Sequence, residues 1–418
     1  MISDKVVKQE TRTNESSKMG RTTVLRLVDR QAPSILRSLF YLILVCILVL
    51  AVDVMLLQYS KNSRSNQLFG YDNMGMPQRR SRPSLDSEED SRSMRRPMRH
   101  KVKPDPRGPL PSLAVPINRA YFESSNVTCR KGYARTRLQN LYGDRFDPDI
   151  PLFVDSSFLD RPNAVNLPMP FGFRDAERTV LNILKHMPQT EIPEDIPQDS
   201  CLRCVVQGNG GIASRTRLGE VIDNFDVVFR LNSAPTINHE NDVGRKTTFR
   251  MAYPESAFRR PEQYDPGWTF VLMMFKPLDL VWLETIIRGR KMNSRDGFWK
   301  KIPLSVPKPT KDFRIFNPEI LQDTASMMGY QLNDGKANKN IPTSGMLAIM
   351  MGVRLCDEVA VAGFGYDPNK PGAALHYYDS LPMREIWKSW THDIHHERGI
   401  LRLLKQQGII TDLSGGIR

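Results

Sequence analysis

The stretch Arg203-Cys-Val-Val-Gln-Gly-Asn-Gly-Gly-Ile212, continued by Asp226-Val-Val-Phe-Arg-Leu-Asn232, decides the fold. Residues 204–207 predict a short buried strand, after which the glycines allow a tight turn. Residues 214–224 have the apolar spacing of a helix, and residues 226–231 form a second apolar strand. This succession of strand, glycine turn, helix and strand predicts a βαβ unit.

Asn209 and Asn232 follow the two predicted strands. Because such units bind ligands beyond the carboxyl ends of their strands, both asparagines are candidates to face one ligand. Gly208, Gly210 and Ala213 fit a loose G-x-G-x-x-A, which is typical of dinucleotide-binding folds. That pattern needs an acidic residue at the end of the second strand, and here the strand ends in Arg-Leu-Asn. The unit therefore favours a nucleotide-like ligand other than a dinucleotide.

Strands and helices continue to alternate after this unit. The predicted strands are Thr247–Ala252, Trp268–Phe275 and Phe313–Phe316, and the predicted helices are Leu278–Arg290 and Pro318–Met328. This alternation over almost 300 residues predicts a single α/β domain, Rossmann-like, with a largely parallel twisted sheet.

The first part of the chain has a different composition. Residues 1–37 are a polar tail, and the apolar run 38–59 is long enough to cross a membrane at about 1.5 Å per residue. Basic residues before the run favour a type II orientation, with a cytosolic tail and a lumenal remainder. Residues 60–119 are rich in Ser, Pro and Arg and predict a flexible stem, because they cannot bury enough apolar surface to fold. Residues 120–418 are then the lumenal domain.

The positive charge lies mostly outside that domain. The whole chain of 418 residues carries +13. Residues 1–59 hold eight basic and five acidic residues, and residues 60–119 hold thirteen and six, so that only +3 remains for residues 120–418. A nearly balanced domain gives no reason to expect a nucleic-acid partner.

Four of the five cysteines, Cys129, Cys201, Cys204 and Cys356, lie in the predicted lumenal part. Cys201-Leu-Arg-Cys204 has the C-x-x-C form of a zinc or redox site, but no second pair supplies the other zinc ligands. An even number of cysteines in an oxidising compartment instead predicts two disulfides. Asn126-Val-Thr128 is an N-glycosylation sequon where the stem meets the domain.

One acidic pair could indicate a metal site. Asp147-Pro-Asp149 has the D-x-D form that holds a divalent cation in many sugar-nucleotide transferases. Such a pair normally ends a buried strand, whereas this one precedes its apolar run and is split by proline. We therefore expect no metal site here.

Ile341-Pro-Thr-Ser-Gly345 precedes the apolar run 346–355, which is too long for a strand and predicts a buried helix. Thr343 or Ser344 would cap it. A helix start with hydroxyls and free N–H groups binds anions, above all phosphate, although an ordinary cap would look the same. The strand predicted from Glu358 to the glycines before Tyr366 supplies a second ligand-facing edge.

Four of the seven histidines lie between residues 376 and 396. Histidine is suited to taking a proton from a hydroxyl near neutral pH. His376 lies in a predicted loop, and His392 lies near the start of the final helix with Glu397 five residues later. Five residues correspond to about 140° around a helix, so these two side chains meet only if the helix begins after the histidine.

Four segments, in this order, resemble the sialylmotifs of the animal sialyltransferases. They are Cys201 to about Glu255, Pro342–Gly365, His376–Asp379 and, in the H-x-x-x-x-E form, His392–Glu397. Further segments are similar to the β-galactoside α-2,3 branch, most of all to its N-acetyllactosaminide enzymes, with the lactosylceramide (GM3) enzymes as near relatives. Those segments are Arg259–Tyr264, Asp296–Trp299, Gly363–Asp367 and Ile410–Ser414.

The resemblance implies a Golgi enzyme with a GT-A-like fold. Such enzymes transfer sialic acid from CMP-sialic acid to the 3-hydroxyl of terminal galactose, with inversion and without a metal or other cofactor. Asn209, Asn232, Thr343, Ser344 and Gly345 would bind the donor.

The same resemblance assigns the histidines and the cysteines. His376 would stabilise the departing phosphate, and His392 would be the general base. Cys204 would be bridged to Cys356, which leaves Cys129 for Cys201. Gly210 stands where several relatives have serine.

A protein of another class, a lectin-like Golgi protein without turnover, is the main alternative. The presence of both histidines argues against it, because a protein that only binds needs no base. The sequence leaves open whether the acceptor is a glycoprotein or a glycolipid.

Overall fold

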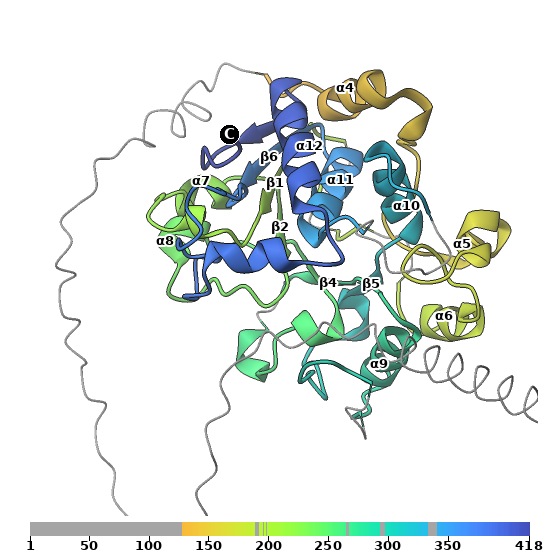
Figure 1. The fold of residues 1–418 in the computed structure, drawn as a ribbon. Coiled ribbons are helices and arrows are strands. Elements are labelled where there is room, and N and C mark those ends of the chain that lie inside the picture. Colours follow the sequence, from red (N-terminus) through yellow and green to blue (C-terminus); the bar gives the residue numbers. More distant parts are fainter. Residues whose placement is uncertain are drawn as a thin grey trace, which may run out of the picture. The chain divides into compact units, whose positions relative to one another are not determined.

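The computed structural model describes residues 128–418, apart from 189–191, 195, 198, 265–266, 293–296 and 333–340 (Figure 1). The predicted tail, membrane span and stem, and the sequon at Asn126, lie outside the described residues. No helix within the described part of the chain is long and apolar enough to span a membrane.

A seven-stranded sheet in the order β5-β4-β3-β2-β1-β6-β7 forms the centre of the fold, and every neighbouring pair is parallel. The predicted parallel α/β domain is therefore confirmed. The strands are β1 (Arg203–Gln207), β2 (Val227–Leu231), β3 (Phe249–Ala252), β4 (Thr269–Leu272), β5 (Phe313–Ile315), β6 (Glu358–Ala362) and β7 (Ile410–Asp412).

Helices cover both faces of the sheet, as Figure 1 shows. They are α4 (Tyr133–Tyr142), α5 (Pro162–Asn166), α6 (Glu177–Leu184), α7 (Gly219–Asp223), α8 (Glu240–Val243), α9 (Pro277–Ile287), α10 (Pro318–Met327), α11 (Ser344–Leu355) and α12 (Ile394–Gln406). The core clusters follow the alternation of the strands: Cys204 and Val206 of β1 pack with α4, α10, α11 and α12, whereas Val205 packs with α7 on the opposite face. Helices α6 and α9 cover that opposite face beneath β4 and β5.

Burial on both faces explains the apolar composition of the strands. All five residues of β2 and of β6 are buried, which is the pattern of a parallel sheet between two helical layers. In this arrangement the strands share one carboxyl edge, and each crossover helix begins at that edge. Thr343, which precedes α11, therefore lies at the same edge as the residues that follow β1 and β2.

The prediction of a helix over residues 214–224 is wrong in its extent, because only Gly219–Asp223 is helical. Arg215 and Arg217 have positive φ angles of 66° and 54°, which a right-handed helix does not allow. Their backbone N–H groups donate instead to the carboxylate of Asp242, at 2.8 and 2.9 Å. The predicted strand 268–275 is likewise shorter, since it ends at Leu272.

Both disulfides are present, with Cys129 bonded to Cys201 and Cys204 to Cys356. These pairings are those that the resemblance implied. The second bridge joins β1 to the residue that ends α11.

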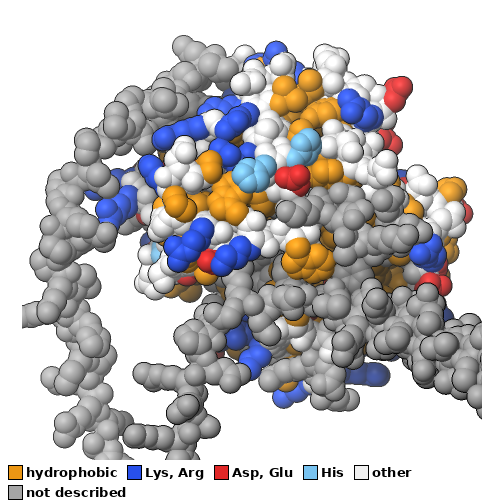
Figure 2. Space-filling view, in the orientation of Figure 1, with side chains coloured by type: hydrophobic (Ala, Val, Ile, Leu, Met, Phe, Trp, Pro, Cys, Tyr) orange, Lys and Arg blue, Asp and Glu red, His pale blue; other side chains and the backbone are white. Residues whose placement is uncertain are grey.

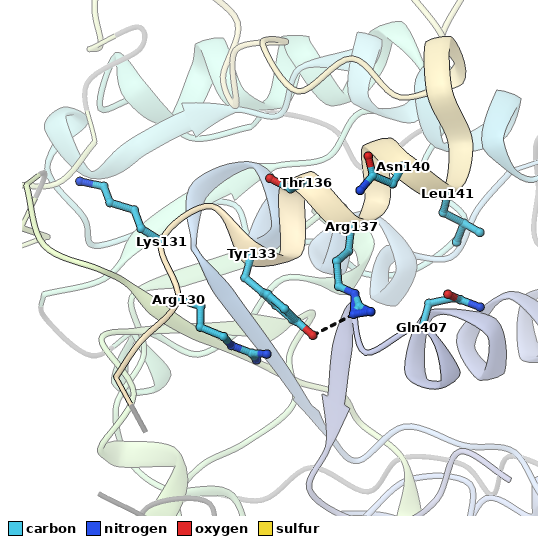
Figure 3. A pocket seen from close by; sticks show the side chains of 8 residues that line it. All are labelled: Arg130, Lys131, Tyr133, Thr136, Arg137, Asn140, Leu141 and Gln407. Atoms are coloured by element: carbon cyan, nitrogen blue, oxygen red, sulfur yellow. Dashed lines mark hydrogen bonds between the residues drawn. The ribbon is translucent and has the colours of Figure 1, made fainter. Parts of the chain in front are cut away.

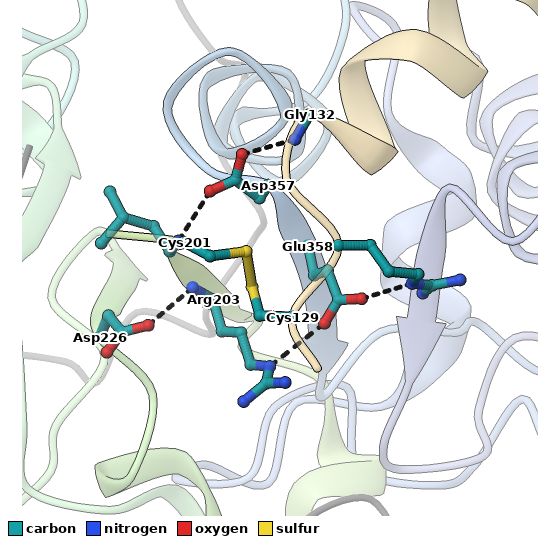
Figure 4. Close-up of a disulfide and its surroundings, with 9 residues drawn as sticks. Cys129, Gly132, Cys201, Arg203, Asp226, Asp357 and Glu358 are labelled. Atoms are coloured by element: carbon teal, nitrogen blue, oxygen red, sulfur yellow. Dashed lines mark hydrogen bonds and ion pairs between the residues drawn. A yellow bond between two sulfur atoms is a disulfide. The ribbon is translucent and has the colours of Figure 1, made fainter. Parts of the chain in front are cut away.

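Charged groups surround the first bridge at the amino edge of the sheet (Figure 4). Asp357 accepts hydrogen bonds from the N–H groups of Gly132 and Leu202, and Glu358 pairs with Arg130 and Arg203. The segment that enters the domain is thereby fixed to β1 and β6.

Candidate active site

The turn after β1 lies directly against the loop that carries His376. Gly210 and His376 form an antiparallel bridge. The N–H of Gly211 donates to the carbonyl of Leu375 at 2.9 Å, and the N–H of Tyr377 donates to the carbonyl of Asn209 at 3.1 Å. Two segments more than 160 residues apart in the sequence are thus joined at the carboxyl edge.

Close backbone packing accounts for the glycines of this turn. A Cβ on Gly210 would lie 2.5 Å from the carbonyl oxygen of Gly363, and one on Gly211 would lie 2.2 Å from that of Ala374. Real Cβ atoms do not approach a backbone oxygen so closely, so this backbone excludes a side chain at either position. A serine at position 210 would therefore require the turn to shift.

His376 is held by two side chains of its own loop. Its Nδ1 lies 2.8 Å from Oδ2 of Asp379, and its ring stacks on that of Tyr378 with a centroid distance of 5.1 Å. A carboxylate only accepts hydrogen bonds, so Nδ1 carries the proton and Nε2 is directed to other partners. The side chain is 27% exposed, so a ligand can reach it.

Asn209 and Asn232 each have a buried Oδ1 with no hydrogen-bond partner among the described residues. Asn232 has a φ of 56°, and Arg250 donates to its carbonyl at 2.8 Å. Buried amide oxygens are normally satisfied, and an orphaned pair at the edge where ligands bind indicates that donors from a ligand complete them. An amino group or ribose hydroxyl is such a donor.

Thr343 is the N-cap of α11, as predicted, and its Oγ1 accepts from the N–H of Met346 at 3.3 Å. The N–H groups of Ser344 and Gly345 belong to the first turn, where the helix itself provides no acceptor. A Cβ on Gly345 would lie 2.9 Å from the ring of Phe364, so the helix start packs tightly on the loop after β6. The result is a rigid start of a helix that presents N–H groups to an anion.

Glu397 holds this helix start in place. Its Oε2 accepts from the N–H of Thr343 at 3.0 Å, and its Oε1 accepts from the Thr343 hydroxyl. The carboxyl is only 4% exposed, and burial raises its pKa to about 7, against the two hydrogen bonds from Thr343. The carboxyl of Glu397 thus changes charge near neutral pH.

His392 contacts the same segment, two residues before Thr343. Its Nδ1 lies 2.7 Å from the carbonyl of Ile341, and because a carbonyl only accepts, Nδ1 carries the proton. Burial lowers the pKa of His392, and the bond to Ile341 opposes that shift. At neutral pH the ring is therefore uncharged, with a lone pair on Nε2, which is the state a general base requires.

Helix α12 begins at Ile394, after the histidine, with Asp393 as its N-cap. His392 and Glu397 therefore need not lie on one helical face, and both contact the segment 341–343 that precedes α11. Sequence reasoning could not establish this relation, since the contacts join residues 51 and 54 positions apart. Sequence reasoning also assigned no role to Tyr378 or Asp379, which hold the ring of His376.

Asp147 and Asp149 lie away from this edge. Asp149 N–H donates to the Asp147 carboxylate at 2.9 Å, and Arg354 near the end of α11 donates to the Asp147 carbonyl at 3.1 Å. Helix α11 has 12 residues, so its two ends are roughly 18 Å apart at about 1.5 Å per residue. The acidic pair is thus near the opposite end of α11 from Thr343.

In the described part of the chain, one group of side chains has the proximity of metal ligands: Cys129, Cys201 and Asp357. Its two cysteines are bonded to each other, so their thiolates are not free to bind a metal.

A cavity of about 520 Å³ lies on another part of the domain (Figure 3). Its lining comes from residues 130–141 and from Gln407. Arg130, one of the lining residues, pairs at 2.7 Å with Glu358, the first residue of β6. The cavity is therefore at the amino edge of the sheet and is separate from the two histidines.

Figure 2 shows histidine side chains exposed on the face of the molecule where α12 lies. The parallel sheet brings the Oδ1 atoms of Asn209 and Asn232 (unpartnered among the described residues), the start of α11 and two oriented histidines to one edge, which is where α/β folds bind ligands. Residues 154–409 match glycosyltransferase family 29, the sialyltransferases. The chain belongs to this family.

Among curated relatives, the chain is 42% identical over 307 residues to the mouse CMP-N-acetylneuraminate-beta-1,4-galactoside alpha-2,3-sialyltransferase, covering 73% of this chain and 82% of the relative. It is 38% identical over 295 residues to the mouse lactosylceramide alpha-2,3-sialyltransferase, covering 69% and 71%. A crystal structure of a mammalian sialyltransferase has the same fold, with a TM-score of 0.52, 24% identity and coverage of 69% of this chain and 98% of that one.

Proposed function

We propose that this chain is a β-galactoside α-2,3-sialyltransferase, which transfers sialic acid from CMP-sialic acid to the 3-hydroxyl of a terminal galactose with inversion. Family membership and the 42% identity to a relative of that name support the activity. The observation that carries the chemistry is the environment of His392, which is half-buried, uncharged at neutral pH and beside the start of α11.

The reaction requires a base on one side of the anomeric carbon and charge stabilisation on the other. Nε2 of His392 takes the proton of the galactose 3-hydroxyl as its oxygen attacks C2 of sialic acid. The bond from C2 to the phosphate oxygen breaks, and its electron pair leaves with CMP. His376 acts on that phosphate in its imidazolium form, in which Nδ1–H is held by Asp379 and Nε2–H donates to the phosphate and stabilises the charge that develops on it.

Asn209 and Asn232 hold the cytidine and phosphate end of the donor, because their orphaned oxygens accept from its amino and hydroxyl groups. Thr343, Ser344 and Gly345 contact the donor through the start of α11. These groups come from β1, β2 and α11, which share one edge of the sheet.

The transfer proceeds without a divalent cation. CMP carries one phosphate, a smaller charge than the diphosphate of a UDP-sugar, and a helix start with a histidine suits it. The position of Asp147 and Asp149 at the far end of α11 supports this proposal.

For the acceptor we propose glycans that end in Galβ1-4GlcNAc, because the relative with the higher identity carries beta-1,4-galactoside in its name. Lactosylceramide is the alternative acceptor, after the relatives at 38%. Transfer by the full chain to Galβ1-4GlcNAc and to lactosylceramide, measured side by side, decides between them.

A lectin-like protein with this fold would bind CMP-sialic acid without consuming it. Slow hydrolysis of the donor in the absence of an acceptor separates the two functions, because water can replace the galactose hydroxyl in an enzyme. We expect release of free sialic acid. CMP-sialic acid that is bound but stays intact over many hours would refute the enzymatic proposal.

The chain is further proposed to be a single-pass type II Golgi membrane protein, with residues 1–37 cytosolic, 38–59 in the membrane, 60–119 as a stem and 120–418 lumenal. Asn126 is the proposed glycosylation site. In sealed Golgi vesicles, protease should leave the domain intact, and glycosidase should reduce its mass only when Asn126 is present.

A further inference from the structure

Three aromatic side chains gather where β3 and β4 end. Tyr253 directly follows β3, and its ring lies 5.2 Å from that of Phe275, three residues after β4. The ring of Trp299 lies 6.2 Å from that of Tyr253, at an interplanar angle of 36°. Trp299 is 37% exposed, so part of its ring faces solvent.

A half-buried lysine joins the loops that carry these rings. Nζ of Lys276 lies 2.8 Å from Oε1 of Glu255 and 2.6 Å from Oδ1 of Asp279. It also lies 4.9 Å from the ring centroid of Phe298, the neighbour of Trp299. One cation thus connects the segments after β3, after β4 and after α9. The surface formed by Tyr253, Phe275 and Trp299, here called the aromatic surface, is therefore preorganised.

The buried carboxylate of Glu255 has a further property. The residue is 2% exposed, and its Oε2 has no hydrogen-bond partner among the described residues. A charged acceptor left without a donor is costly, so a hydroxyl from a ligand or an ordered water is needed to satisfy it.

The aromatic surface lies on the catalytic side of the sheet. Phe275 packs against the core cluster that contains α11, and so does Ile341, whose carbonyl accepts the hydrogen bond from Nδ1 of His392. The sheet order places β3 two strands from β1, which corresponds to about 10 Å at about 4.8 Å per strand. The surface is therefore one step beyond the donor residues along the same edge.

We propose that Tyr253 and Trp299 bind the second sugar of the acceptor, the pyranose that follows the reactive galactose. This inference rests on the proposed function. Aromatic rings stack on the C–H face of a pyranose, whose hydroxyls remain free for hydrogen bonds at the rim. Charged groups around the rings, including Lys300 with Nζ 6.0 Å from the Trp299 centroid, suit a hydroxylated ring better than a lipid chain.

The test compares two acceptors that differ only in the second sugar, methyl β-galactoside and Galβ1-4GlcNAc, with the full chain. Trp299→Ala is expected to raise KM for the disaccharide about tenfold, equivalent to about 1.4 kcal/mol. KM for the monosaccharide should stay within about twofold, because it does not reach the aromatic surface. Trp299→Phe should restore most of the disaccharide affinity.

Val281→Ala is the matched control, because Val281 is an exposed apolar residue (42%) on α9. Donor hydrolysis without an acceptor reports on folding. If Trp299→Ala no longer hydrolyses the donor, the variant is misfolded. Trp299→Leu, which keeps apolar bulk but has no aromatic face, is then measured instead.

An equal rise in both KM values, or no rise in either, would overturn the proposal. An effect confined to lactosylceramide would assign the surface to lipid instead. Absence of transfer by the unmodified chain would refute the proposed function itself, which keeps the two failures distinct.

Discussion

Replacing Glu397 by glutamine tests how the start of α11 is held. In the native protein this carboxyl receives two hydrogen bonds from Thr343, and burial raises its pKa to about 7. Glutamine has nearly the same shape and can still accept from the N–H of Thr343, but it does not titrate. The variant therefore removes the charge while keeping the contact.

The raised pKa has a defined effect on stability. In the unfolded chain the carboxyl has a pKa near 4.3, so between about pH 4.3 and pH 7 the folded protein binds more protons than the unfolded chain. Stability from this group is therefore present at low pH and is lost as pH rises through this window. At about 1.36 kcal/mol per pKa unit, the loss is on the order of 3 kcal/mol above pH 7.

The assay is urea denaturation of wild type and Glu397→Gln from pH 4.5 to pH 8. The free energy of unfolding of the variant should rise relative to that of wild type by on the order of 3 kcal/mol from pH 4.5 to pH 8, because the variant has no buried carboxyl to ionise. Glu220→Gln, on the exposed surface of α7, is the matched control. If the difference between variant and wild type does not change with pH, the argument that Glu397 is forced toward its neutral form is wrong.

Four further predictions concern catalysis and folding. His392→Ala should lower the transfer rate by about 10²–10⁴-fold while leaving CMP binding nearly unchanged, whereas His376→Ala should weaken both CMP binding and transfer. CMP binding by calorimetry and transfer kinetics are measured for each variant. If only His392→Ala loses CMP binding, the roles of the two histidines are the reverse of those proposed. Because burial lowers the pKa of His392, the acid limb of kcat/KM should have its midpoint below the ordinary value near 6.5, and a midpoint above that value would exclude a buried neutral base. Activity should persist in EDTA, and loss that manganese restores would point to a metal site. The double variant Cys204→Ser, Cys356→Ser should be less stable by roughly 4–5 kcal/mol, since the bridge closes a loop with a sequence separation of 152, and an unchanged denaturation midpoint would contradict this.

Local patterns in the sequence predicted most of the sheet. Strands such as β2 are short apolar runs bounded by turn residues, and the parallel fold follows from their alternation with helices. Strand β7 was missed because it has only three residues, of which Thr411 is exposed, so it is too short to show a period. The helix expected over 214–224 failed for another reason. Its apolar spacing suits a helix. However, the carboxylate of Asp242 in α8 accepts from the N–H groups of Arg215 and Arg217 and holds these residues at positive φ, which a right-handed helix does not allow.

Sequence position also indicated the asparagines and the N-cap, because each follows from where an element ends. The histidines were different. That His376 lies beside Gly210 depends on backbone bonds between distant segments, and no local period encodes such a pairing. The orientation of His392 likewise depends on the carbonyl of Ile341, which a sequence pattern does not reveal. Only the resemblance to a family pointed to these two residues.

The distribution of these groups over the sheet has a consequence for specificity. The proposed donor residues follow β1 and β2 or begin α11, whereas the aromatic surface follows β3 and β4. Because each strand end carries its own loop, the loops after β3 and β4 can change without disturbing Asn209 or the helix start. Relatives named for a beta-1,4-galactoside and for lactosylceramide share 42% and 38% of aligned residues with this chain. On the proposed assignment, separate loops contact the donor and the acceptor, so that substitutions in the acceptor loops need not disturb the donor site.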